Sequence, residues 1–381
     1  MLKLHIGNIS DKEKRMETKK LIDCCEFISD GDHLPPPKSD SGVPFITISN
    51  ITGQNKLSFE DTMFVPESYY NGLNENKKAQ KGDILYSVVG SFGKPVYVDF
   101  DKQMVFQRHI AILRPKRNVN ARFIYYTMLN PQFYKLVDKL AIGCSQRTVT
   151  LDTLRNIEVN LPDKDIQDKM VGILSLIDEK IDINNNVNDN LEQQIQLIFD
   201  YLFPDVCAGN KHMGDFIIPK RGKSLLSKNA VHGNVPVIAG GLEPSIYHNV
   251  ANTIAPVVTI SSSGANAGFV NIWGVPVWSS DSSYIDSEMS RYVYFWYAYL
   301  KRHQNNIYNI QTGSAQPHIY PSHISSLPIT DLDYKKIENY TEIVSPIFST
   351  ITKNHVENQH LQSLRDWLLP MLMNGQATIN D

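Results

Sequence analysis

Two short motifs in the sequence have the residue types of an active site. Pro162-Asp163, followed by Asp178-Glu-Lys180, has the order of carboxylates and lysine with which some nucleases hold a metal ion. Asn130-Pro-Gln-Phe133 is similar to the loop with which amino-methyltransferases hold an exocyclic amine, but its second proline is missing. The nuclease-like carboxylates lie about four turns apart on one expected helix and cannot share a metal. Neither motif therefore predicts catalysis.

The other residue types that carry chemistry are scattered. The 11 histidines show no metal-binding spacing, and the adjacent Cys24 and Cys25 have no nearby ligands and are expected to be buried. The glycine-rich segments 87–93 and 261–268 fit neither the dinucleotide fingerprint nor the phosphate-binding loop, and we expect tight turns there. We therefore expect no catalytic residue, no metal and no cofactor on this chain.

Cations and amides in loops rich in glycine, serine and asparagine are the remaining candidates. The densest group is Lys220–Lys228 (KRGKSLLSK), where a glycine lets the backbone approach a phosphate. Side chains of this kind contact DNA phosphates and base edges. The residues expected to do so are Lys38, Arg108, Gln146, Arg147, Lys220, Arg221, Lys223, Ser224, Lys228, Ser262, Asn266 and Gln316.

The net charge of −3 argues against a nucleic-acid partner only when the chain is taken as a whole. Lysine and arginine minus aspartate and glutamate give +4 for residues 1–160 and +2 for residues 204–328. The same count gives −6 for residues 161–203 and −3 for residues 329–381. The two acidic regions are expected to meet protein, while the two basic regions can approach phosphate.

The composition is that of a globular protein with two or three domains, since the chain has 381 residues of which 42% are hydrophobic. The longest apolar run, Tyr292–Leu300, is too short to span a bilayer, so we expect no membrane association. The first 20 residues lack the apolar segment of a secretion signal, and the four cysteines show no disulfide spacing. A cytoplasmic location is expected.

The chain repeats itself. Four short anchors recur in the same order: Gly42–Ile46 with Asn234–Ile238, Ser87–Gly90 with Ser261–Gly264, Gly143–Gln146 with Gly313–Gln316, and Ile157–Val159 with Leu327–Ile329. Each half begins with short strand-like runs separated by turn residues, and a long helical segment closes it. The fold class that this predicts is α+β, with two similar mixed lobes joined by two long antiparallel helices.

Both helical segments carry an apolar stripe with a period near 3.6 residues. The first should begin near Asp163, an N-cap candidate, and the second near Asp331–Asp333. Each has about forty residues and would be roughly 60 Å long, so each stripe needs a partner stripe. The seam of this coiled coil is expected to contain Ile173, Ile177, Ile181, Asn184, Leu191, Ile347, Ile351, Asn354, Leu361 and Leu368.

Asn184 and Asn354 take equivalent places in the two stripes. They could fix the register of the seam, as single polar residues do in coiled coils, or they could face solvent. The expected division of the chain is a first lobe (residues 1–162), a central helix (163–203), a second lobe (204–328) and a C-terminal helix (329–381).

This layout resembles the DNA-specificity subunit of type I restriction–modification systems, the HsdS family, over essentially the whole chain. The resemblance rests on the duplicated order, on Gln146 followed by the Ile157–Pro162 strand, and on the terminal Leu361–Gly375 segment. It implies two target recognition domains that each read half of a split DNA site, and a coiled coil that spaces them. It also implies two docked methyltransferase subunits, with or without restriction subunits, which bring S-adenosylmethionine, magnesium and ATP.

The second half departs from this pattern, since Pro328 interrupts the strand that ends at Leu161-Pro162 in the first half. The first lobe also has more residues ahead of the shared anchors, so we expect different and longer recognition loops there. Two other functions stay open. A nuclease or methyltransferase would require a catalytic group of residues, and a pure protein-interaction scaffold would bind without the steep salt dependence of phosphate contacts.

Overall fold

A computed structural model of the chain describes residues 3–6, 16–144, 146–313 and 316–380. It divides into two compact units. The first contains Met1–Glu179 with Leu361–Asp381, and the second contains Lys180–His360. Each unit thus holds one of the expected lobes together with sections of both long helices. The four-part division of the chain into lobes and helices stays a prediction.

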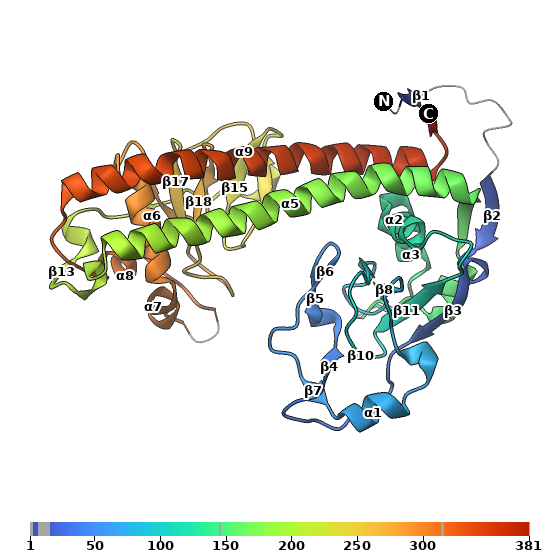
Figure 1. The fold of residues 1–381 in the computed structure, drawn as a ribbon. Coiled ribbons are helices and arrows are strands. Elements are labelled where there is room, and N and C mark those ends of the chain that lie inside the picture. The colour runs from blue at the N-terminus through green and yellow to red at the C-terminus, as the bar shows by residue number, and fades with distance from the viewer. Residues whose placement is uncertain (1–2, 7–15, 145, 314–315, 381) are drawn as a thin grey trace. The chain divides into compact units, whose positions relative to one another are not determined.

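The first lobe is built on a four-stranded sheet with the order β3-β11-β8-β9. All of its neighbours are antiparallel. The lobe also contains a three-stranded sheet with the order β10-β4-β7, in which β10 and β4 are parallel. A third sheet, β12-β2, lies beside the start of the first long helix (Figure 1). The strands are β2 (Met16–Lys20), β3 (Cys25–Asp30), β4 (Val43–Ile46), β7 (Phe64–Val65), β8 (Ile84–Ser87), β9 (Pro95–Tyr97), β10 (Val105–Phe106), β11 (Ile110–Pro115) and β12 (Glu158–Pro162).

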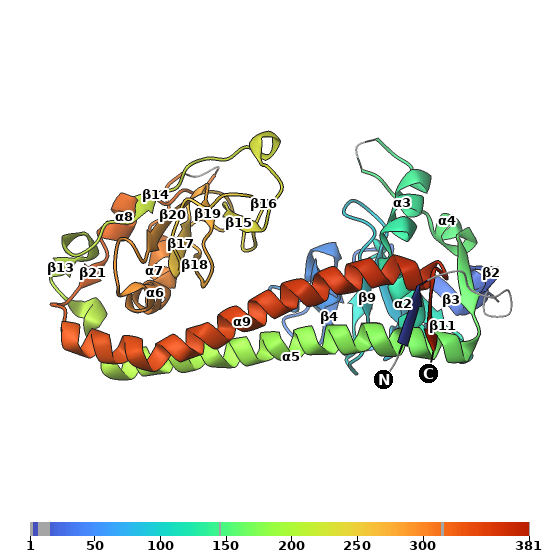
Figure 2. The same cartoon turned by 90° about the horizontal axis from the view of Figure 1, so that it is seen from above.

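The second lobe has the same topology in its own unit. Its four-stranded sheet has the order β14-β20-β17-β18, its three-stranded sheet β16-β15-β19 again contains one parallel pair, and β13-β21 corresponds to β12-β2 (Figure 2). The strands are β13 (Lys211–His212), β14 (Lys220–Arg221), β15 (Val235–Ile238), β16 (Ile246–His248), β17 (Val257–Ser261), β18 (Val270–Trp273), β19 (Trp278–Ser279), β20 (Ser282–Asp286) and β21 (Pro328–Ile329). The fold class and the internal repeat expected from the sequence are confirmed.

Helices occur at matching places in the two lobes. Helix α2 contacts β9 and β11, and α6 contacts β17, β18 and β20. Short helices follow each of them, and one more precedes the last strand of each lobe. Their bounds are α2 (Ala121–Leu129), α3 (Pro131–Leu140), α4 (Leu151–Asn156), α6 (Val293–Arg302), α7 (Gln304–Asn309) and α8 (Pro321–Ser325). The apolar run Tyr292–Leu300 is thus mostly the buried helix α6. No helix in the described parts of the chain is long and apolar enough to cross a membrane.

The lobes differ where the first one was expected to be longer. Between β4 and β8, residues 47–83 hold the hairpin β5-β6, strand β7 and helix α1, whereas residues 239–256 between β15 and β17 hold only β16. The additional strands and helix are β5 (Ile51–Gly53), β6 (Lys56–Leu57) and α1 (Glu67–Gly72). The strand that ends at Pro162 in the first lobe also shrinks to the two residues of β21 in the second.

The two long helices begin where their capping residues predict. Helix α5 covers Lys164–Leu202 and helix α9 covers Tyr334–Met373. The side chain of Asp333 accepts a hydrogen bond from the Lys336 backbone N–H, 3.1 Å away, which caps the first turn of α9. After α9, the terminal strand β22 (Ala377–Asn380) pairs with the first strand, β1 (Lys3–Ile6).

The expected seam residues lie on the inner faces of these helices. Ile177, Ile181, Ile351 and Leu368 are buried, while Ile173, Leu191, Ile347 and Leu361 are half-buried. In the second unit, apolar residues of α5 and α9 continue into the core of the lobe. Phe199 and Phe203 of that unit pack edge-on against Tyr340.

A polar layer interrupts the apolar seam within the second unit. Asn184 is 3% exposed and donates a hydrogen bond to the Asn358 side chain at 2.8 Å. Asn354 is half-buried and donates to Asn188 at 2.7 Å. Both Asn184 and Asn354 therefore face the partner helix rather than solvent, which agrees with the first of the two interpretations of these residues.

Candidate nucleic-acid interface

Three segments of the first lobe meet at the end of its large sheet. The backbone N–H of Val88, just after β8, donates to the carbonyl of His109, 2.9 Å away. The Val88 carbonyl in turn accepts from the Val149 N–H at 2.8 Å. Gly90 then donates to the carbonyl of Arg147 at 3.0 Å. These bonds hold the segment before β11 and the segment around Gln146 on either side of the Val88–Gly90 turn.

The second lobe repeats this frame bond for bond. Ser262 donates to the carbonyl of Asp281 at 3.1 Å, Ile319 donates to the carbonyl of Ser262 at 2.9 Å, and Gly264 donates to the carbonyl of Pro317 at 3.1 Å. The two lobes thus present different side chains on one shared backbone arrangement. We call this arrangement the recognition frame.

A glycine makes the same close turn in both frames. Gly143 has φ +98°, and a Cβ atom there would lie 2.6 Å from the carbonyl oxygen of Gln146. Gly313 has φ +93°, and its Cβ would lie 2.5 Å from the carbonyl oxygen of Gln316. A side chain at either position would therefore push the exposed glutamine away. Ser145, between Gly143 and Gln146, and Ser314 and Ala315, between Gly313 and Gln316, lie outside the described residues.

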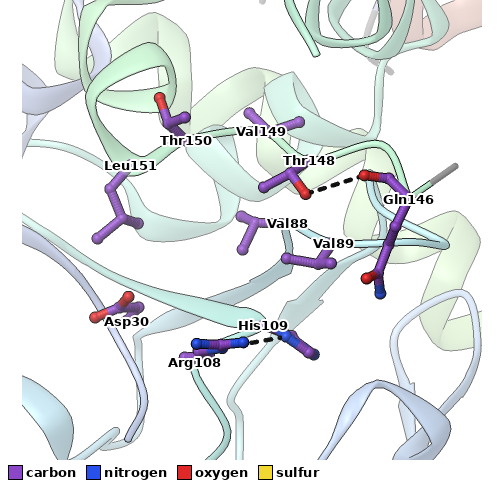
Figure 3. A pocket seen from close by; sticks show the side chains of 10 residues that line it. All are labelled: Asp30, Val88, Val89, Arg108, His109, Gln146, Thr148, Val149, Thr150 and Leu151. Carbon is purple, nitrogen blue, oxygen red and sulfur yellow. Dashed lines mark hydrogen bonds between the residues drawn. The ribbon is translucent and has the colours of Figure 1, made fainter. Parts of the chain in front are cut away.

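The first frame borders a cavity of about 280 Å³ (Figure 3). Two of the residues expected to bind DNA, Arg108 and Gln146, are both part of its wall. The other lining residues are Asp30, Val88, Val89, His109, Thr148, Val149, Thr150 and Leu151. The cavity is therefore lined by polar and charged side chains together with four apolar ones, a mixture that can orient a ligand through hydrogen bonds.

The pair Arg108–His109 defines the hydrogen-bonding character of this cavity. The Arg108 Nε–H donates to Nε2 of His109 at 3.4 Å, so that this ring nitrogen is the acceptor (Figure 3). Burial lowers the pKa of His109, and the neighbouring positive charge of Arg108 lowers it further. The neutral imidazole then carries its proton on Nδ1. Arg108 and His109 together offer hydrogen-bond donors to a ligand.

Arg147 is less available than Arg108. Its guanidinium forms an ion pair with Asp138 and also donates to the backbone carbonyl of that residue. It lies over the ring of Phe92, with 5.7 Å between the guanidinium carbon and the ring centre. Arg147 thus ties the frame to helix α3, and its charge is largely balanced.

The second frame has a carboxylate at its centre. Asp281 accepts a hydrogen bond from the Arg221 guanidinium at 2.6 Å and another from the Ser263 hydroxyl. About 37% of its side chain remains exposed. Lys220 and Arg221 form strand β14, which pairs with β20. Lys223 is fixed through its backbone, since its N–H donates to Ser279 and its carbonyl accepts from the Trp278 indole.

The remaining expected residues do not all lie at the frames. Gln316 is exposed on the second frame, and Asn266 is half-buried in the turn after β17. Lys38, Ser224 and Lys228 are exposed on loops before β4 and β15. The structure contradicts the expectation for Ser262, which is 1% exposed because both its backbone groups bond inside the frame. Ser263 is the accessible hydroxyl at this turn.

Three acidic or imidazole side chains at the frames are not among the residues expected to bind DNA. His109, Asp30 and Asp281 flank residues that were chosen for their cationic charge. The signal was present in the repeat, since residues just before β11 and β20 must take corresponding places. The expected DNA-binding residues are all lysine, arginine, glutamine, asparagine or serine, so carboxylates and imidazoles are not among them.

The motifs that resemble active sites have structural roles. Asn130 caps helix α3 by accepting a hydrogen bond from the Gln132 N–H at 3.0 Å, and Pro131 occupies the first turn. Asp178 accepts from Tyr126 at 2.7 Å and from Arg365 at 2.9 Å. Among the described residues, no three histidine, cysteine, aspartate or glutamate side chains are grouped so that they could hold a metal ion.

Comparisons with known proteins agree with the resemblance stated above. Residues 13–193 match the model of the type I restriction modification DNA specificity domain. The specificity subunit of type I restriction enzyme HindI from Haemophilus influenzae is 28% identical over 189 residues, 46% of this chain and 41% of that protein. The specificity subunit of type I restriction enzyme MjaVIII from Methanocaldococcus jannaschii is 25% identical over 207 residues, 52% of this chain and 47% of that protein.

The chain thus spans about half the length of these curated relatives. A solved structure of a type I restriction–modification S subunit from M. genitalium shares the fold, with a TM-score of 0.56 and 17% identity. That likeness covers 96% of this chain and 98% of the other. These relatives are named as specificity subunits of type I restriction enzymes.

Proposed function

Because residues 13–193 belong to the family of type I restriction modification DNA specificity domains, we propose that this chain selects the DNA sequence for a type I restriction–modification complex. Each lobe reads one half of a bipartite site, and the base pairs between the two halves are not read. The chain itself catalyses nothing. Methyltransferase subunits supply S-adenosylmethionine chemistry, and restriction subunits, where present, supply magnesium and ATP chemistry.

The observation that carries this proposal is the recognition frame, which occurs twice with different side chains. The first frame presents Arg108, His109 and Gln146, whereas the second presents Arg221, Asp281 and Gln316. A duplicated backbone supports two readers of the same kind of ligand. Different side chains on it read different bases, so the DNA site is asymmetric.

The long helices take the role of spacer and docking surface in this proposal. In the second unit, four large apolar residues of α5 are exposed, and Tyr201 is the most exposed of them at 85%. Ile183, Val187, Leu197 and Tyr201 fall on one face of the helix at 100° per residue, away from the seam residues Ile181 and Asn184. An apolar stripe on an acidic helix suits a protein partner better than DNA.

The proposal is tested in the host by sequencing that detects DNA methylation. Deletion of the gene should remove methylation from one split sequence throughout the genome, and restoring the gene should return it. A genome whose methylation does not change would overturn the proposal.

Docking is tested by changing the apolar stripe alone, because residues 361–381 are part of the first unit and truncation there would also damage the first lobe. Leu197→Glu with Tyr201→Glu should abolish co-purification of methyltransferase subunits. Asn186→Glu with Gln193→Glu is the matched control, because both residues are exposed on α5 and the change adds the same charge without removing an apolar side chain. It should leave co-purification intact. Full assembly on the Leu197 and Tyr201 double variant would exclude this docking surface.

A further inference from the structure

The two recognition frames carry opposite charges at corresponding positions. In the first lobe, Gly31 donates to the carbonyl of Ile110 at 3.2 Å and Gln107 donates to that of Ile46 at 2.9 Å. In the second, Gly222 donates to the carbonyl of Ser282 at 2.8 Å and Ser280 to that of Ile238 at 2.8 Å. These backbone bonds align the two lobes residue by residue, without reference to side chains.

In this alignment, the residues on either side of the glycine are acidic in the first lobe and basic in the second. Asp30 pairs with Ala111 across the first sheet, and Arg221 pairs with Ser283 across the second. Two residues further along, Asp32 in the first lobe takes the place of Lys223 in the second. Each donates its backbone N–H to the carbonyl of the last residue of a short strand, β10 in the first lobe and β19 in the second. Two carboxylates thus stand where the second lobe has two cations.

The turn just before β11 or β20 differs in the opposite way: it carries a cation in the first lobe and a carboxylate in the second. Arg108 and His109 lie between Gln107 and Ile110, whereas Asp281 alone lies between Ser280 and Ser282. The carbonyls of His109 and Asp281 accept the corresponding frame bonds. The first lobe therefore puts donors at this position, and the second puts an acceptor there.

We propose that this position selects the base in each half-site, so that the lobes read groups of opposite hydrogen-bonding polarity. This inference rests on the proposed function. Arg108 donates to acceptor atoms such as O6 and N7 of guanine. Asp281 accepts from an exocyclic amino group in the major groove, which belongs to cytosine or to adenine.

The surroundings of Asp281 suit a reader better than a simple ion pair. Arg221 and Ser263 hold one oxygen each, and they fix the orientation of the carboxylate before DNA arrives. A carboxylate has about four acceptor positions, so two remain for the base. The Ser263 hydroxyl has no counterpart in the first frame, where Val89 makes the corresponding backbone bridge to Thr148. Arg221 keeps the acceptor from repelling the nearby phosphates.

The test is selection of binding sites from a randomised duplex library by the full-length chain with its methyltransferase subunits. Wild-type protein should enrich two short half-sites. Asp281→Asn should lower the preference at one base pair by about tenfold and leave the other half-site unchanged. The base pair that loses its preference distinguishes cytosine from adenine. Arg108→Gln should change the other half-site only.

Two variants separate reading from structural support. Arg221→Gln removes one of the two groups that orient the carboxylate but keeps the acceptor, so it should weaken binding and reduce the strength of the second half-site's preference while the preferred base stays the same. Asp331→Asn breaks an ion pair with Lys211 far along the chain from the frame and should change nothing in the selected sequence. If Asp281→Asn and Arg108→Gln both keep the wild-type bases, the inference is wrong. If wild-type protein enriches no split sequence, the proposed function fails instead.

Discussion

Asn184 of α5 donates a hydrogen bond to the side chain of Asn358 of α9 at 2.8 Å, in the middle of an otherwise apolar seam. Asn358 itself donates to Asn185 at 2.9 Å, and Lys180 donates to Asn184 at 2.9 Å. Hydrogen bonds from Asn184 and Lys180 lower the pKa of Glu357 beside this layer. A polar layer of this kind is satisfied in one register of the two helices and unsatisfied in others.

The first prediction follows from this layer. Asn184→Leu alone should lower the free energy of unfolding by about 1–3 kcal/mol, because it leaves Asn358 buried with one partner fewer. Asn184→Leu combined with Asn358→Leu should be nearly neutral or stabilising, because both polar groups then leave the seam. Denaturant unfolding measures the stability of the single and the double variant, and hydrogen exchange shows whether the two long helices are the part that is affected. A double variant that loses as much stability as Asn184→Leu alone would contradict the prediction.

The second prediction concerns Arg365, whose side chain is only 9% exposed and is paired with Asp178. Arg365→Met should cost about 3 kcal/mol, since it leaves Asp178 partly buried without its cation. Adding Asp178→Asn should recover part of that loss, because the amide oxygen can still accept from Tyr126. Arg291→Met is the control: that pair with Glu338 is exposed to solvent, so its loss should have little effect on stability. Similar melting temperatures for the two single variants would contradict the prediction.

How far the sequence predicts this structure depends on how local each feature is. The starts of both long helices follow from single capping residues and from the 3.6-residue period, so they were placed to within a few residues of Lys164 and Tyr334. The duplicated sheets follow from motifs that recur in the same order along one chain. Local features of this kind are encoded by residues close in sequence.

The recognition frames are the opposite case. Asp30 and Arg108 line one cavity although 78 positions separate them, and only the register of β3 against β11 brings them together. One inserted residue, Arg108, also separates the two frames, so a gapless alignment of the halves hides the correspondence of His109 with Asp281. Ser262 illustrates the same limit, because its burial depends on bonds to two distant segments.

The third prediction uses the turn glycines. Gly313→Ala should destabilise the second lobe by about 1–3 kcal/mol and weaken binding to the half-site that this lobe reads. The reason is that φ is +93° and the new Cβ would meet the carbonyl oxygen of Gln316. Gly264→Ala has a similar φ of +83° but no atom within 4 Å of the new Cβ. It isolates the backbone cost from the clash. Melting temperature and half-site affinity measure both, and equal effects would exclude the clash as the cause.

The fourth prediction concerns pH. The pKa of His109 is lowered by burial and by Arg108, so the folded state binds the proton less readily than the unfolded state does. Its contribution to stability is therefore complete above the unfolded pKa of about 6.5 and is lost as the pH falls through the lower folded value. His109→Gln should flatten the stability profile in this window. Thermal melts of the wild-type protein and the variant, recorded at intervals of about half a pH unit between about pH 5 and 8, measure this difference in pH dependence. Parallel profiles would contradict it.

The fifth prediction distinguishes DNA binding from a scaffold role. Lys220 of strand β14 and Lys223 just after that strand are exposed beside the second frame, and Lys223 is held through its backbone. Lys220→Gln with Lys223→Gln should weaken binding to every sequence similarly and should lower the slope of log affinity against log salt by about 2, because two phosphate contacts are lost. Lys353→Gln on the acidic helix α9 is the control and should leave the slope unchanged. If the wild-type complex shows no salt dependence at all, its lobes do not contact phosphate, and a protein or peptide partner would explain them better.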